Sequence, residues 1–447
     1  EPHRRTTPFG RLVVRGGLAL LAAGSCAIAA SAVAQPAKGA FCGGTSIAWS
    51  TDMAQSATDR LGNAVTFGQP KATLDYSNDL FALSLLRLAE RTGNTALRDY
   101  GENIVGSFVA ADGSIKQVPQ NGFRLDAMPA GLVLIEIYNR THDEKYRKAA
   151  DYMRQRLAVL PRTSEGTFAW APNQIWLDGL WMTEPFYARY AKEFNQPADF
   201  DDILQQYRAV AAHSRDPKTG LYYHGWDERH EQFWANHATG TSSSFWGRSI
   251  GWFAMSLVDT LDSVPQDHPL HAYLVQLLSQ LAPALVHYQD PKSGLWWEVV
   301  DQGGRDGNYT EASASAMYVY TLAKGVNRGY LSADYAAPAV RGFAGLVRDK
   351  VVRDDQGRWS LTSIVRSAGL GPPPAVWPPG SAPSRRDAAP GGRDGSFEYY
   401  VEQPIVTDNP HGLGPFILDG IELDKLAIVT RAGAPAQFDA DCRFPRN

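Results

Sequence analysis

The chain has 447 residues, with 43 Lys and Arg against 47 Asp and Glu, a balance that excludes a basic nucleic-acid binder. A charged fraction of 20% and a mean hydropathy of −0.29 also exclude a disordered chain and a bundle of membrane helices. Aromatic residues make up 11% of the chain, including 12 Trp and 19 Tyr, so we expect a large core, a cleft that binds rings, or both.

Residues 1–34 predict a secretion signal peptide. Four Arg within the first 15 residues precede an uncharged apolar run, Gly17–Ala34, which ends in small residues suited to cleavage before Gln35. A membrane anchor is the alternative, but the run is short and weakly hydrophobic for a span of about 20 residues. We therefore expect export to the periplasm or the extracellular space, no membrane contact for the mature chain, and a single domain over residues 35–447. Cys26 lies in a weak lipoprotein context, and lipid anchoring stays open.

Only two Cys residues follow the predicted signal peptide, Cys42 and Cys442, near opposite ends of the chain. In an exported protein they either form one disulfide or remain two free thiols. No Cys-x-x-Cys pair is present, which argues against a zinc ribbon or a redox site.

The rest of the chain predicts one helix after another, because apolar residues recur at intervals of three and four. The predicted helices are Asn78–Arg91, Met128–Asn139, Glu144–Leu160, Trp176–Phe194, Ile203–Ala212, Trp246–Leu261, Pro269–Tyr288, Ala312–Lys324, Ala336–Val347 and Gly414–Val429. With short helices between them the count reaches ten to twelve, and short loops favour antiparallel neighbours. So many helices predict an all-α toroid with an inner and an outer ring, whose loops at one end surround a funnel.

One segment interrupts this pattern. Gly371–Arg393 holds seven of the 28 Pro residues and cannot be helical. Because the apolar pattern resumes after it, we interpret the segment as a surface insertion within the domain.

The chemistry is predicted from carboxylates and aromatic residues. The motifs of nucleotide binding, serine esterases and zinc proteases are absent, and the His residues are scattered, so we expect no metal and no cofactor. Four clusters place an ionisable side chain among aromatic residues at a helix entrance: Phe123–Gly131 with Asp126, Gln174–Met182 with Asp178, Leu221–Glu228 with His224, and Ser244–Trp252 with Arg248. Singly, each could be a helix cap, a core Trp, a loop His or a structural ion pair. In a toroid, the four entrances would face one cleft.

The order of these clusters resembles glycoside hydrolase family 105, the unsaturated rhamnogalacturonyl hydrolases, which are related to the unsaturated glucuronyl hydrolases of family 88. The resemblance spans roughly Leu74 to Thr430 and implies an (α/α)6 barrel. The segments that carry it are Trp176–Met182, Tyr223–Asp227, Phe245–Trp252, Asn308–Met317, Arg393–Tyr400 and Gly412–Phe416. The Pro-rich insertion departs from the pattern of the family, so the subsite for the leaving sugar stays open.

The resemblance implies a hydrolase that removes a C4=C5 unsaturated uronic acid from the non-reducing end of lyase-generated oligosaccharides, most often of the rhamnogalacturonan type. It implies Asp178 as the general acid, which must keep its proton near neutral pH, and Asp126 as the second essential carboxylate. The implied substrate-binding residues are His224, Trp246, Arg248, Trp176, Met182 and Trp252. Arg248 would offer its guanidinium to the uronate carboxylate, and Trp246 a stacking face.

Two other functions remain possible on this sequence. A polysaccharide lyase could use a similar toroid, and a non-catalytic oligosaccharide-binding protein could use the same aromatic cleft. The leaving sugar, the parent polysaccharide and the oligomeric state are not predicted.

Overall fold

The structure is a computed structural model that describes residues 44–64, 66, 72–118, 125–372 and 392–426. The chain divides into two compact units, Glu1–Ala37 and Lys38–Asn447, and all that follows concerns the second. The predicted signal peptide, Cys26, Cys42, Cys442 and most of the Pro-rich segment lie outside the described residues.

Local sequence signals explain where the helices begin and end, as helix α2 (Tyr76–Thr92) illustrates. The side chain of Asp75 accepts a hydrogen bond from the Ser77 amide and caps the first turn. Gly93 ends the helix in a left-handed conformation with φ of 75°, which glycine adopts without a steric penalty. Between these caps most side chains are buried, which makes α2 a helix of the interior.

Six helices form a closed inner ring. Each packs against the next in the order α2, α4, α6, α8, α10 and α13, and α13 packs again on α2. After α2, the members are α4 (Ala130–Thr141), α6 (Asp178–Glu193), α8 (Gly247–Leu261), α10 (Ala312–Asn327) and α13 (Pro410–Lys425). The large buried side chains Trp181, Trp252 and Phe186 come from these helices and fill the ring.

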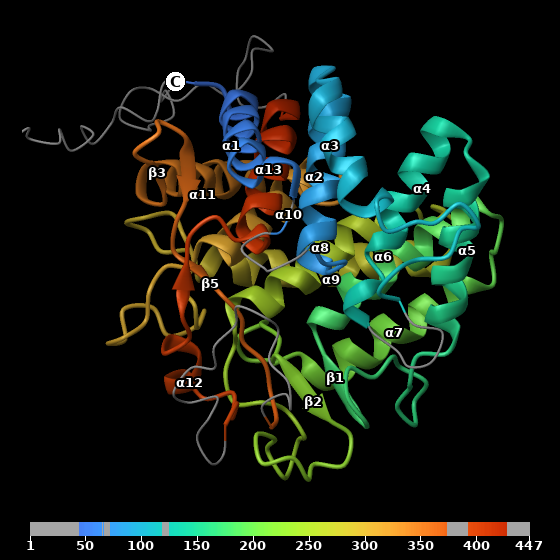
Figure 1. Cartoon of the computed structure of the whole chain (residues 1–447). Coiled ribbons are helices and arrows are strands. Elements are labelled where there is room, and N and C mark those ends of the chain that lie inside the picture. The colour runs from blue at the N-terminus through green and yellow to red at the C-terminus, as the bar shows by residue number, and fades with distance from the viewer. Residues whose placement is uncertain (1–43, 65, 67–71, 119–124, 373–391, 427–447) are drawn as a thin grey trace, which may run out of the picture. The chain divides into compact units, whose positions relative to one another are not determined.

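Six further helices lie outside this ring and connect its members (Figure 1). They are α1 (Ser46–Leu61), α3 (Thr95–Gly106), α5 (Glu144–Ala158), α7 (Asp199–Ser214), α9 (Pro269–His287) and α11 (Ala336–Asp349). The predicted all-α (α/α)6 barrel is therefore confirmed. All ten predicted helices have a counterpart in the structure, although residues 427–429 of the predicted helix Gly414–Val429 lie outside the described residues, and α1 and α3 add to them. No helix in the described ranges is both long and apolar enough to cross a membrane.

Short strands and turns occupy the loops between the helices. Strand β1 (Gln174–Trp176) pairs antiparallel with β2 (Gly225–Asp227), so Trp176 lies opposite Gly225. The prediction that a helix starts at Trp176 is wrong by two residues, because this pairing holds Trp176 extended and α6 begins at Asp178. The other pairs are β3 (Val351–Arg353) with β4 (Trp359–Leu361) and β5 (Ile364–Val365) with β6 (Ile405–Val406), and a short helix, α12 (Phe397–Val401), precedes β6.

The connectivity gives the inner helices a common direction. Each inner helix is preceded in the chain by an outer helix that runs antiparallel to it, so all six inner helices begin at the same end of the barrel. The residues at or just before these starts include Tyr76, Asp178, Trp246 and His411. This end of the barrel is therefore where the predicted site residues meet.

Candidate active site

Asp178 and His224 meet because the β1–β2 pair brings two distant segments together. The Leu177 amide donates a hydrogen bond to the His224 carbonyl at 2.9 Å and extends the ladder by one residue. Asp178 then opens α6, and its Oδ2 lies 3.2 Å from Nε2 of His224. The His224 side chain is fully buried, whereas the Asp178 side chain keeps 12% of its surface exposed. The carboxyl group therefore remains reachable while its partner is enclosed.

His224 is held at its second ring nitrogen as well. Its Nδ1 shares a hydrogen bond of 2.8 Å with the hydroxyl of Tyr400 in α12. The Tyr400 ring in turn stacks on Trp246, with centroids 5.6 Å apart and an interplanar angle of 10°. The imidazole cannot rotate without losing both contacts, so it fixes the position of the Asp178 carboxyl group.

Trp246 and Arg248 flank the start of α8 and face a buried polar cluster. The Trp246 indole donates to Oε1 of Glu298 at 2.8 Å, and the Arg248 guanidinium lies 5.0 Å from the Trp246 ring. Arg248 donates from Nη1 to the Val365 carbonyl and from Nη2 to the Arg366 carbonyl at 3.3 Å. Its Nε is buried without a hydrogen-bond partner. The guanidinium thus anchors β5 to the barrel and keeps one donor unused.

The other predicted binding residues surround this pair at different depths. Trp176 is 7% exposed, its ring stacks on Trp170 with centroids 5.1 Å apart, and its edge meets His224 at 5.2 Å. Met182 lies one turn after Asp178 on α6 and is fully buried. Trp252 is 1% exposed and packs on Trp181 at 4.9 Å. These three side chains are therefore buried, and Trp170, which stacks on Trp176, is half-buried.

Asp126 lies shortly before the inner helix α4. It lies in a single helical turn, Leu125–Ala127, which packs against the first turn of α6. A methyl group on Gly179 would lie 3.3 Å from the Leu125 side chain, so the turn closely follows the residue after Asp178. Asp126, Asp178 and Arg248 all contribute to the electrostatic environment of one phenol, that of Tyr76. Both predicted carboxylates and the predicted cation therefore influence the ionisation of Tyr76.

Sequence reasoning missed four residues of this arrangement: Tyr76, Glu298, Tyr400 and His411. Tyr400 lies in a segment that carries the family resemblance, yet no side-chain function was predicted for it. Glu298 and His411 are buried ionisable groups, and such groups are a functional signal only once their neighbours are known. Tyr76 begins α2, where the Asp75 cap alone explains the sequence pattern.

Glu298 is the buried carboxyl group beneath Trp246. Burial raises its pKa well above the usual range, the neighbouring Glu311 raises it further, and Arg248 opposes the shift. Its Oε1 accepts the indole hydrogen bond, while Oε2 is buried without a hydrogen-bond partner. The folded chain therefore favours the protonated form of Glu298.

This raised pKa predicts a dependence of stability on pH. An unfolded Glu ionises near pH 4.3. The contribution of Glu298 to stability is therefore complete below that pH and is lost as the pH rises toward the raised pKa of the folded state, by up to about 1.4 kcal/mol per pH unit. Glu298→Gln keeps an acceptor for Trp246 and removes the ionisation. Urea unfolding from about pH 5 to pH 8 should show a smaller decline of the unfolding free energy for the variant, and parallel curves would contradict the assignment.

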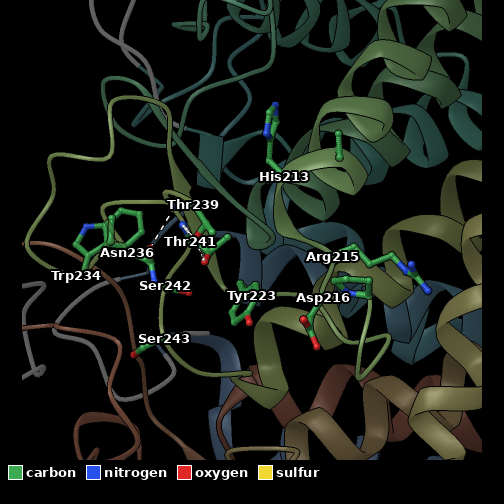
Figure 2. Close-up of a pocket in the computed structure, with 13 residues that line it drawn as sticks. His213, Arg215, Asp216, Tyr223, Trp234, Asn236, Thr239, Thr241, Ser242 and Ser243 are labelled. Carbon is green, nitrogen blue, oxygen red and sulfur yellow. Dashed lines mark hydrogen bonds between the residues drawn. The ribbon is translucent and has the colours of Figure 1, made fainter.

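A pocket of about 670 Å³ lies elsewhere, between the end of α7 and the loop that follows β2 (Figure 2). None of the predicted site residues lines it, although its Tyr223 directly precedes His224 in the chain. Figure 2 shows the His213 and Arg215 side chains pointing away from the hydroxyl groups of Thr239 and Thr241. Its polar groups do not converge on one point. In the described part of the chain, no three His, Cys, Asp or Glu side chains are arranged to hold a metal ion.

Comparison with known proteins identifies the family. The sequence profile of Glycosyl Hydrolase Family 88 matches residues 49–427. The unsaturated rhamnogalacturonyl hydrolase YesR of Bacillus subtilis (strain 168) is 31% identical over 255 residues, which are 55% of this chain and 69% of that protein.

Two solved structures extend this comparison. A family 105 glycoside hydrolase of C. acetobutylicum ATCC 824 is 36% identical, with a TM-score of 0.76 over 83% of this chain and 98% of that chain. The unsaturated glucuronyl hydrolase of Bacillus sp. GL1 shares the fold at 14% identity, with a TM-score of 0.59 over 87% of this chain and 97% of that chain. The profile match covers most of the chain, and the resemblance to families 105 and 88 predicted from the motifs is confirmed. The chain is a glycoside hydrolase that belongs to glycosyl hydrolase family 88 and is similar to family 105.

Proposed function

We propose that this hydrolase removes a C4=C5 unsaturated uronic acid from the non-reducing end of lyase-generated oligosaccharides, with the rhamnogalacturonan type as the preferred class. The observation that carries the proposal is the Asp178 carboxyl group, partly exposed and 3.2 Å from the buried His224. A single positioned acid is what hydration of an enol ether requires. The similarity to the unsaturated rhamnogalacturonyl hydrolase YesR supports the same substrate class.

The proposed reaction begins with proton transfer from Asp178 to C4 of the unsaturated ring. Positive charge develops at C5 and on the ring oxygen, and water adds at C5 while its proton returns to the Asp178 carboxylate. The resulting hemiketal opens and releases the neighbouring sugar. Between the two proton transfers the carboxylate lies beside His224, whose ring can offer it a hydrogen bond.

The other predicted residues receive proposed functions from their positions. Asp126 lies in the turn that packs against α6, where we propose that it binds hydroxyl groups of the sugar. We propose that Arg248 supplies the cation for the uronate carboxylate. Trp246, Trp176, Met182 and Trp252 are nearly or fully buried, so we propose that they shape and dry the site rather than cover a sugar face.

The test is a panel of unsaturated oligosaccharides made by polysaccharide lyases of different specificity. A hydrolase of this kind abolishes the C4=C5 double bond, so ultraviolet absorbance falls as product forms. A gain of absorbance on the intact polymer would indicate a lyase instead. Binding of the oligosaccharides with no change in absorbance would indicate a non-catalytic binding protein.

We also propose that residues 1–34 direct export and that residues 35–447 form one domain in the periplasm or outside the cell. The charged start, the apolar run and the small residues before Gln35 support export. N-terminal sequencing of the protein from the culture medium or the periplasm checks this, and a mature chain that retains residues 1–34 would overturn it.

A further inference from the structure

His411 is a buried histidine at the entrance of α13 that the proposed reaction does not use. It is 7% exposed and lies between two partners, the Asn409 side chain on its Nδ1 and the Tyr76 hydroxyl on its Nε2, the latter at 2.8 Å. Trp252 packs edge-on against both the Tyr76 ring at 5.6 Å and the imidazole at 6.3 Å. The predicted binding residue Trp252 thus holds the pair in place.

The cap of α13 shows which ring nitrogen of His411 carries the hydrogen. Oδ1 of Asn409 caps α13 by accepting a hydrogen bond from the His411 amide at 3.0 Å, so the atom facing Nδ1 is an oxygen without a hydrogen. Nδ1 must therefore donate. Burial lowers the pKa of His411 well below its usual range, and the charge of Arg248 lowers it further, so the ring carries one proton. Nε2 then has only a lone pair to offer.

The tautomer of His411 determines what Tyr76 can do. The Tyr76 hydroxyl has one hydrogen, and it is donated to Nε2 of His411. The oxygen of Tyr76 consequently has only lone pairs to offer any further partner. An oxygen in that state accepts a hydrogen bond and cannot donate one.

We propose that His411 is a positioning residue that fixes Tyr76 as a hydrogen-bond acceptor for a hydroxyl group of the bound unsaturated sugar. The inference rests on the proposed function for the identity of the sugar, but not for the direction of the hydrogen bond. Because its only hydrogen is donated to His411, Tyr76 remains a hydrogen-bond acceptor whether Asp178 is protonated or ionised.

The experiment combines kinetics with a direct observation of the tautomer. Tyr76→Phe removes the acceptor, and His411→Phe frees the hydroxyl to turn, so each should raise KM about tenfold with a smaller change in kcat. The double variant should be no worse than Tyr76→Phe alone, because both changes remove the same hydrogen bond. His411→Gln, which keeps an acceptor for Tyr76, should restore KM to within about threefold of the native value.

Tyr190→Phe, which removes a hydroxyl bonded to Asp151 at 2.6 Å at the other end of α6, is the matched control and should leave KM unchanged.

Additive effects in the double variant, or a fall in kcat at constant KM for His411→Phe, would overturn the proposal. Nitrogen-15 NMR of the imidazole tests the tautomer without any substrate. We expect a protonated Nδ1 and an unprotonated Nε2, and the opposite tautomer would overturn the inference. If the native protein is inactive on the oligosaccharide panel while the tautomer is as expected, the failure lies with the proposed function.

Discussion

Replacing Asp178 with Asn is expected to lower kcat by about 10³-fold, within the range that a positioned general acid contributes. Asn has the same shape as Asp but cannot deliver a proton to C4 of the substrate. The side chain keeps its place at the start of α6, and one of its polar atoms can still meet Nε2 of His224. Binding of the unsaturated disaccharide, measured by calorimetry, should therefore remain within about threefold of the native value, while the rate of absorbance loss collapses.

Asp201→Asn is the matched control for this variant. Asp201 also lies in the first turn of a helix, α7, but its side chain is 80% exposed and is not placed in the site. Its replacement should change neither kcat nor KM. Near-native turnover of Asp178→Asn would remove Asp178 as the acid, and a variant that fails to fold would show that its main function is to start α6.

The helices could be predicted from the sequence because their signals are local. Apolar spacing, caps such as Asp75 and stop residues such as Gly93 act within a few residues, and all ten predicted helices are found in the structure. Helices α1 and α3 were not predicted. Ser46 and Ser50 of α1 are buried only because their hydroxyls bond to backbone carbonyls of α13, more than 360 residues away. No local pattern contains that pairing.

The difference between local signals and contacts of distant segments also explains which site residues could be predicted. Asp178, His224 and Arg248 each lie in a short aromatic segment, and the pattern of such segments is visible in the chain. Tyr76 and His411 are 335 residues apart and meet only because the inner ring closes between α2 and α13. Their hydrogen bond depends on ring closure, which has no signature in either segment.

Replacing Arg248 with Ala is expected to be the most destabilising single change in the site. The guanidinium is 1% exposed and satisfies the carbonyls of Val365 and Arg366, which would lose their donors in the variant. One buried and one part-buried carbonyl that lose their donors cost about 3 kcal/mol in the free energy of unfolding. Urea unfolding at pH 7 measures this loss.

The activity of the same variant tests the proposed capture of the uronate carboxylate. Without Arg248 we expect kcat/KM on the unsaturated disaccharide to fall by about 10²-fold, the value of a charge-assisted contact in an enclosed site. Arg248→Lys keeps the positive charge but loses the planar guanidinium with its several donors. Its stability and its kcat/KM should therefore lie between those of the native protein and those of Arg248→Ala. Arg98→Ala is the control, since the Arg98 side chain is 33% exposed and pairs with Asp99, which is 65% exposed, and removal of such a surface pair costs less than about 1 kcal/mol. If Arg248→Ala unfolds at the native urea concentration and turns over substrate within about threefold of the native rate, Arg248 neither anchors β5 nor binds the carboxylate.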